Sequence, residues 1–142
     1  MKYRPAEAKY NKQHKGRRFN KVAKSEVFTP ALSVSVVYLK VREAVRLHED
    51  LIEMIRTTVK KRTKKYGAVR LSLLADTPVS KKPLEIRMGK GKGAINAWYV
   101  RLVPGSILVK IIFYKPIFYR TIKGTLEYLQ KKLPIKTFIA SK

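Results

Sequence analysis

The sequence contains no cysteine and few acidic residues, and both shortages exclude or disfavour whole classes of protein. Without cysteine among its 142 residues, the chain cannot form disulfides, iron–sulfur clusters or thiolate zinc sites. Only 9 residues are Asp or Glu and only 2 are His, so side chains for acid–base catalysis or for a metal centre are scarce. We therefore expect no catalytic residue, no metal site and no cofactor, and we do not predict an enzyme.

Long apolar segments are also missing. The longest apolar run, Ile107 to Tyr119, is interrupted by Lys110, Lys115 and Pro116. It is shorter than the roughly 20 residues that a membrane-spanning helix needs. Insertion into a membrane is therefore not expected.

What the chain has in excess is positive charge. Its 33 Lys and Arg residues give a formal net charge of +24, and a polyanion is needed to offset the self-repulsion of so many cations. Nucleic acid is the first candidate partner, because cations that displace counterions from phosphates supply much of the affinity. An anionic membrane surface is the alternative. Hydrophobic residues make up 45% of the chain, which is enough for one packed core.

The first 26 residues form a basic segment with few apolar positions. Tyr3, Tyr10 and Phe19 are interleaved with the cations and are suited to stacking on bases. A solvated tail is the other interpretation. We divide the chain into a basic RNA-binding arm, residues 1–26, and a single domain, residues 27–142. The candidate RNA-binding residues of the arm are Lys9, Lys12, His14, Lys15, Arg17 and Arg18.

Two segments of the domain repeat apolar residues at helical spacing. The first runs from Arg46 to about Tyr66, and Gly67 is placed to end it at C′. The second covers residues 118–133 and is stopped by Pro134. His48 lies at the start of the first helix, where we expect a role at the helix terminus rather than in a catalytic dyad.

Strands and loops fill the rest of the domain. Pro104-Gly105 is a turn that we expect to join its two flanking strands as an antiparallel pair. Trp98 is expected in the core of its strand. The expected fold class is α+β, an α/β sandwich of two helices packed on a mostly antiparallel sheet. Strands are predicted at Leu32–Leu39, Val69–Leu74, Ile95–Val103, Ile107–Phe113 and Ile135–Ala140, and a loop at Asp76–Pro83.

The first helix is acidic in its first half and strongly basic in its last turns. This order complements the helix dipole, so a solvated face is one interpretation. The cations of residues 60–65 exceed what the dipole requires, and they favour a phosphate-binding surface. Its candidate RNA-binding residues are Lys60, Lys61, Lys64 and Lys65.

Glycine and lysine alternate in the segment Arg87-Met88-Gly89-Lys90-Gly91-Lys92-Gly93. The spacing does not match a Walker A loop, which needs Ser or Thr after its lysine, or a Rossmann GxGxxG fingerprint. Glycines allow backbone amides and flanking cations to approach phosphates closely, which suits a loop pressed into folded RNA. A solvated hairpin tip is the alternative. Arg87, Lys90 and Lys92 are its candidate RNA-binding residues.

Four segments together carry a family resemblance. RMGKGKG at residues 87–93, KLPIKT at 132–137, KPL at 82–84 and KYNKQHKGR at 9–17 resemble the large-subunit ribosomal protein family L-sixteen. The resemblance implies a non-catalytic constituent of the large ribosomal subunit that binds large-subunit rRNA near the aminoacyl-tRNA site. The loop Arg87–Gly93 is then expected to point toward the peptidyl transferase region, and Lys136 matches the C-terminal motif. The implied partners are large-subunit rRNA, aminoacyl-site tRNA and neighbouring large-subunit proteins.

The chain also departs from the family's usual pattern. Residues 43–48 replace a glycine- and arginine-rich stretch of bacterial members, and Arg70 stands where they usually have Trp. The segment 111–123 is longer, apolar and basic where an acidic segment is usual. Such divergence, with heavy use of Lys, Ile, Tyr and Phe, is similar to that of proteins from AT-rich organellar genomes. We therefore expect a mitochondrial ribosome, with a bacterial or plastid ribosome as the alternative.

Overall fold

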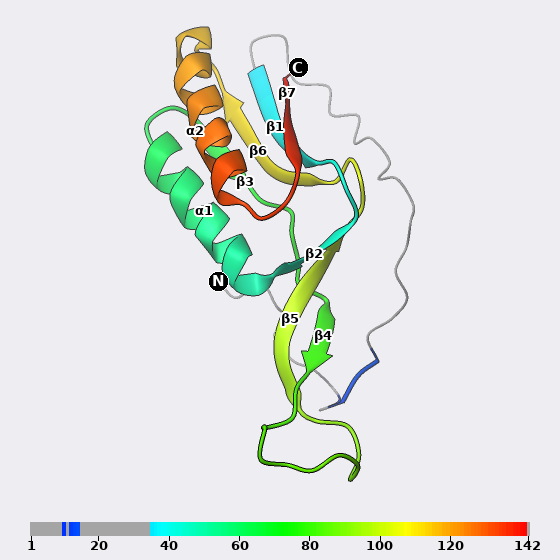
Figure 1. The fold of residues 1–142 in the computed structure, drawn as a ribbon. Coiled ribbons are helices and arrows are strands. Elements are labelled where there is room, and N and C mark those ends of the chain that lie inside the picture. The colour runs from blue at the N-terminus through cyan, green and yellow to red at the C-terminus, as the bar shows by residue number, and fades with distance from the viewer. Residues whose placement is uncertain (1–9, 11, 15–34, 142) are drawn as a thin grey trace.

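The computed structural model describes residues 10, 12–14 and 35–141. These residues form two antiparallel sheets and two helices (Figure 1). One sheet has four strands in the order β3-β6-β1-β7, and the other has three in the order β2-β5-β4. The elements are β1 (Ser35–Val41), β2 (Val45–His48), α1 (Glu49–Thr63), β3 (Ala68–Arg70), β4 (Thr77–Ser80), β5 (Ile95–Leu102), β6 (Ile107–Phe113), η1 (Pro116–Phe118), α2 (Tyr119–Lys132) and β7 (Thr137–Ser141).

The core lies between the two helices and the four-stranded sheet, and it extends to buried residues of β2 and β5. Figure 1 shows α1 and α2 side by side over one face of that sheet. Val37, Leu39 and Val41 alternate along β1 and share one core with apolar stripes that recur every three or four residues along each helix. The neighbouring Val36 and Tyr38 are buried as well. The predicted α+β class is therefore confirmed. The principal core residues are Val37, Leu39 and Val41 of β1, Ile52, Ile55 and Val59 of α1, and Ile122, Leu126 and Leu129 of α2.

The predicted pairing of the strands that flank Pro104-Gly105 is wrong. β5 pairs with β2 and β4, whereas β6 pairs with β1 and β3. The turn carries the chain from one sheet to the other, and the N–H of Gly105 donates to the Val41 carbonyl at 2.8 Å. A short connection keeps two strand ends close, but it does not require the strands to share a ladder.

The first helix is shorter than the spacing of its apolar residues predicts. Residues 45–48 form β2, and α1 begins at Glu49. His48 is its N-cap, and His48 Nδ1 accepts a hydrogen bond from the Asp50 N–H at 3.1 Å, which confirms the role expected at the helix terminus. The buried side chain of Leu47 fits a helix or a strand equally well, so the spacing alone does not separate them.

The predicted C′ role of Gly67 is also wrong. The helix ends at Thr63, and the N–H groups of Tyr66 and Gly67 both donate to the Thr63 carbonyl. Gly67 has no positive φ. Close packing against β6 requires glycine at position 67 instead, because a Cβ there would lie 2.6 Å from the carbonyl oxygen of Ile112.

Other segments also differ from prediction. Residues 77–80, expected in a loop, form β4, and Pro78 is tolerated because β4 is the edge of its sheet. β3 covers only residues 68–70, and β7 begins at Thr137 rather than Ile135. Trp98 is 7% exposed within the core of β5, as expected. The division between arm and domain at residue 26 lies outside the described residues.

Candidate nucleic-acid interface

The glycine-lysine segment belongs to a hairpin loop, residues 81–94, that joins β4 to β5. Figure 1 shows this loop projecting from the end of the molecule opposite the four-stranded sheet. Its base is closed by a hydrogen bond from the Lys81 N–H to the Ala94 carbonyl at 3.2 Å. A Cβ at Gly93 would lie 2.6 Å from the Lys81 carbonyl oxygen, so glycine permits the two sides of the base to approach. The loop is therefore anchored on a paired set of strands.

Three successive residues at the tip have left-handed backbone angles. The φ values are 92° for Gly89, 54° for Lys90 and 83° for Gly91. The left-handed region is disfavoured for residues with a side chain, which explains glycine on both sides of Lys90. The ammonium of Lys82, at the start of the loop, donates to the Gly89 carbonyl and so links the base of the loop to its tip. The tip is thus a defined turn with exposed cations.

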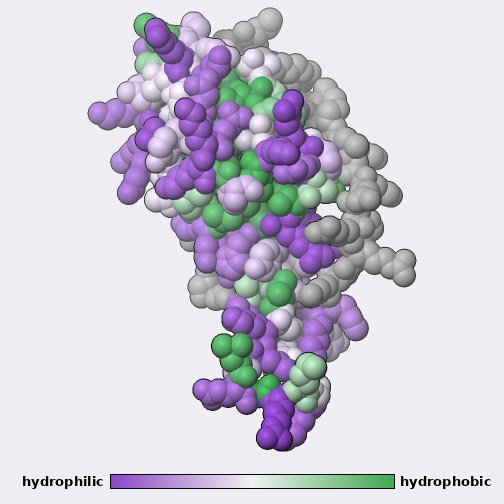
Figure 2. All heavy atoms as spheres, viewed as in Figure 1, coloured by the Kyte–Doolittle hydropathy of each residue, from purple (hydrophilic) through white to green (hydrophobic). Residues whose placement is uncertain are grey.

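Apolar side chains are exposed among these cations. Met88 is 99% exposed and Leu84 is 98% exposed, and Ile86 is half exposed. Figure 2 shows hydrophobic and hydrophilic side chains interleaved over this loop. Met88 was predicted as part of the loop, but Leu84 and Ile86 were missed, although the alternation of residues 84–88 was available as a signal. The loop offers apolar contact surface as well as charge.

The described part of the arm touches this loop. The Lys92 ammonium donates to the backbone carbonyl of Gln13, and Lys12 and His14 are exposed on either side of Gln13. The structure therefore brings two predicted RNA-binding segments together, although they are 79 positions apart in the sequence. The remaining arm candidates, Lys9, Lys15, Arg17 and Arg18, lie outside the described residues.

The cations of α1 form a second group, near the C-terminal end of that helix. Lys60, Lys61, Lys64 and Lys65 are all exposed. Lys60 and Lys64 line one groove together with Arg56 and Arg70, whereas Lys61 and Lys65 do not. Arg56 and Arg70 were missed as candidates, because Arg70 comes from β3 and joins the group only in the folded chain. Figure 1 places this end of α1 away from the hairpin loop.

Lys136 occupies the connection between α2 and β7. Its side chain is exposed, while its carbonyl accepts from the Arg42 N–H at 2.9 Å. Its own N–H donates to a Glu43 carboxylate oxygen at 3.4 Å. The backbone of Lys136 thus fastens the end of α2 to the segment after β1, and its side chain remains available to a partner.

Within the described part of the chain, no three His, Cys, Asp or Glu side chains are grouped to hold a metal ion. The His48 ring is used for helix capping and also packs edge-on against Tyr99, with ring centroids 4.9 Å apart. No helix among residues 35–141 is long and apolar enough to cross a membrane. The hairpin loop gathers exposed cations and exposed apolar side chains at one end of the molecule.

These features define a strongly basic protein that displays cations on an α+β frame. A family model described as Ribosomal protein L16p/L10e matches residues 5–140. The chain therefore belongs to the ribosomal protein L16p/L10e family, a family of structural proteins and not of enzymes. It is 39% identical over 137 residues to the large ribosomal subunit protein uL16 of Nitrobacter winogradskyi, a match that covers 96% of this chain and 95% of that protein.

Other relatives give the same picture. The large ribosomal subunit proteins uL16 of Rhodopseudomonas palustris and Nitrobacter hamburgensis are 38% and 36% identical, again over 96% of this chain and 95% of theirs. The family resemblance carried by the loop, arm and C-terminal motifs is thus confirmed over nearly the whole chain. The chain is a ribosomal protein of the large-subunit type.

Proposed function

We propose that this protein binds large-subunit rRNA near the aminoacyl-tRNA site and the peptidyl transferase region, and so supports translation as a structural constituent. The observation that carries the proposal is the hairpin loop 81–94. It projects from the body, exposes Arg87, Lys90 and Lys92, and contacts the arm through Lys92. A loop of this shape enters a fold of RNA that the broad face of the domain does not reach.

The binding chemistry follows from the composition of the loop. Its cations displace condensed counterions from phosphates, which gives affinity that falls steeply with salt. Apart from the chain neighbours, no atom of the described residues lies within 4 Å of the point where a Cβ would stand on Gly89 or Gly91, so backbone groups at the tip are open to close approach. The exposed side chains of Leu84 and Met88 supply contact surface for sugars and bases. The proposed partners are large-subunit rRNA, aminoacyl-site tRNA and neighbouring large-subunit proteins.

A salt titration of rRNA binding tests this proposal. The full chain should bind its cognate large-subunit rRNA with an affinity that falls as salt is raised. In a plot of log binding constant against log salt concentration, each phosphate contact should add up to about 0.9 to the steepness of the slope. The variant Arg87→Ala, Lys90→Ala, Lys92→Ala should bind more weakly and with a smaller slope. The matched control Lys115→Ala, Lys131→Ala, Lys132→Ala removes three exposed cations outside the loop. A flat titration, or equal losses in both variants, contradicts the proposal.

A basic membrane-surface protein is the competing function. At the salt concentration of the rRNA assay, vesicles containing phosphatidylserine should be bound far more weakly than rRNA, because the loop presents its cations on a narrow projection rather than on a flat face. Strong flotation with anionic vesicles together with weak rRNA binding favours the competing function.

We place the protein in a mitochondrial ribosome. The support is the departure from the usual bacterial pattern at residues 43–48, at Arg70 and at residues 111–123. The named relatives are bacterial, and a bacterial or plastid ribosome is the alternative. Mass spectrometry of large subunits purified from isolated mitochondria should detect this chain. Its detection only in ribosomes of a bacterial cytoplasm overturns the placement.

A further inference from the structure

A groove of about 590 Å³ runs between α1 and the segment that contains β3. Arg56, Lys60 and Lys64 line it from the helix, and Arg70 lines it from the strand. The other lining residues are glycine, alanine, serine and aliphatic residues of the segment 67–72, and no carboxylate of the described residues lines the groove. Four cations from two elements therefore face one concave surface.

The three helical cations are spaced four residues apart. A rise of 1.5 Å per residue places successive members about 6 Å apart along the helix axis, on one face. This spacing is of the same order as the distance between neighbouring phosphates in a nucleic-acid strand. The row therefore matches a chain of phosphates better than it matches a single anion.

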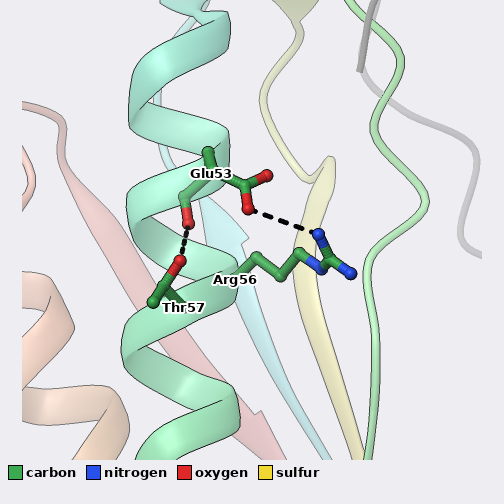
Figure 3. A network of polar contacts seen from close by, with 3 residues as sticks. All are labelled: Glu53, Arg56 and Thr57. Carbon is green, nitrogen blue, oxygen red and sulfur yellow. Dashed lines mark hydrogen bonds and ion pairs between the residues drawn. The ribbon is translucent and has the colours of Figure 1, made fainter. Parts of the chain in front are cut away.

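One ion pair and one free sheet edge also suit the groove to such a ligand. The Arg56 guanidinium lies 3.3 Å from the Glu53 carboxylate, and Figure 3 shows both side chains on the same side of α1. This ion pair orients Arg56 without filling the groove. On the opposite wall, β3 is the edge of the four-stranded sheet, and no described strand pairs with its outer side. Backbone N–H groups on a free sheet edge are donors that phosphate oxygens accept from.

We propose that this groove holds the sugar-phosphate backbone of an rRNA segment different from the segment bound at the hairpin loop. This inference rests on the proposed rRNA-binding function and extends it. The groove and the loop lie at separate places on one frame, so the protein bridges two segments of rRNA and fixes their separation. Arg56 and Arg70 are assigned as phosphate-binding residues, with Lys60 and Lys64.

The groove variant for the test is Lys60→Gln, Lys64→Gln, Arg70→Gln. Its matched control is Lys115→Gln, Lys131→Gln, Lys132→Gln, which removes the same charge from exposed positions that do not line the groove and are not candidate RNA-binding residues. Glutamine keeps helix propensity close to that of lysine, so α1 should fold in both variants. Circular dichroism melts verify folding before RNA is added.

The readout is hydroxyl-radical footprinting on cognate large-subunit rRNA together with the salt slope of binding. We expect two separate protected regions for the full chain. The groove variant should lose one region and lower the slope by about 2 to 3, since each lost phosphate contact contributes about 0.7–0.9. The loop variant should lose the other region, and the control should keep both.

Different failures separate this inference from the function on which it rests. If the full chain protects no rRNA, the proposed function fails. If the full chain protects rRNA but the groove variant keeps both regions, or matches its control, only the groove inference fails. Poly-glutamate provides a further arm. If its binding depends on the groove while the rRNA footprint does not, the groove serves an acidic protein segment and the inference is wrong.

Discussion

The left-handed turn at the loop tip allows a test of whether backbone shape matters apart from charge. The double substitution Gly89→Ala, Gly91→Ala leaves every cation in place. At φ values of 92° and 83°, each added Cβ costs roughly 1–2 kcal/mol in the observed conformation, so the pair costs about 2–4 kcal/mol. If RNA binding requires this conformation, affinity falls by about 30-fold to about 700-fold, since 1.4 kcal/mol is a factor of ten.

The same substitution should leave the free protein nearly as stable as before. In the part of the chain that the structure describes, no atom beyond the chain neighbours lies within 4 Å of either Cβ position, so the loop should relax into another conformation without disturbing β4 or β5. Gly124→Ala is the control. It adds the same methyl group in open space on α2, where it should stabilise the helix by about 1 kcal/mol and leave rRNA binding unchanged.

The assay is rRNA binding by filter retention at fixed salt, with thermal melts monitored by circular dichroism on the same preparations. A loss of affinity with an unchanged melting temperature supports the role of the turn. Unchanged affinity in the double variant refutes it and leaves the loop as a carrier of charge alone. A melting temperature that falls together with affinity refutes the reasoning that the loop relaxes independently of the sheets.

Two further predictions concern packing and the arm. Gly67→Ala should destabilise folding by about 1–3 kcal/mol in urea titrations, because its Cβ would lie 2.6 Å from the Ile112 carbonyl oxygen and 3.2 Å from Phe113 Cβ; stability equal to that of Gly124→Ala speaks against this close contact. Deletion of Met1 to Lys24 should weaken rRNA binding and leave the melting temperature of the domain nearly unchanged. Equal losses of binding and stability would mean that the arm is part of the packed structure.

Local patterns in the sequence were sufficient for the parts of the fold that depend on neighbouring residues. The apolar stripe of the second helix places Ile122, Leu126 and Leu129 in the core, as its spacing predicts. The segment 87–93 is an exposed loop, as its glycines predict. In each case the signal and the structure lie within one helix or one hairpin.

Strand partners could not be predicted in this way. β1 pairs with β6 and β7, far along the chain, and no local pattern in residues 35–41 identifies either partner. The turn at Pro104-Gly105 favoured a hairpin, yet its two strands lie in different sheets, and the backbone of the turn is hydrogen-bonded to Val41 at the end of β1. The partners of these two strands therefore depend on tertiary contacts and not on the residues of the turn.

The candidate site shows the same division. The cations of the loop and of α1 were visible as clusters in the sequence. The groove was not, because Arg70 reaches it from a strand that follows α1. The spacing of Arg56, Lys60 and Lys64 on one helical face was present in the sequence, but nothing local indicated that β3 would face it.

The position of β1 in the middle of its sheet has a consequence for synthesis of the chain. Residues 35–41 emerge early, but their strand partners are residues 107–113 and 137–141. The three-stranded sheet needs only residues 45–102, so the hairpin that carries the loop can acquire its strand register first. The helical layer and its apolar core close last, because pairing over such long separations is slow and must wait for the final strand. A nascent or shortened chain that lacks β7 therefore exposes one edge of β1 and depends on chaperones or rRNA for protection against aggregation.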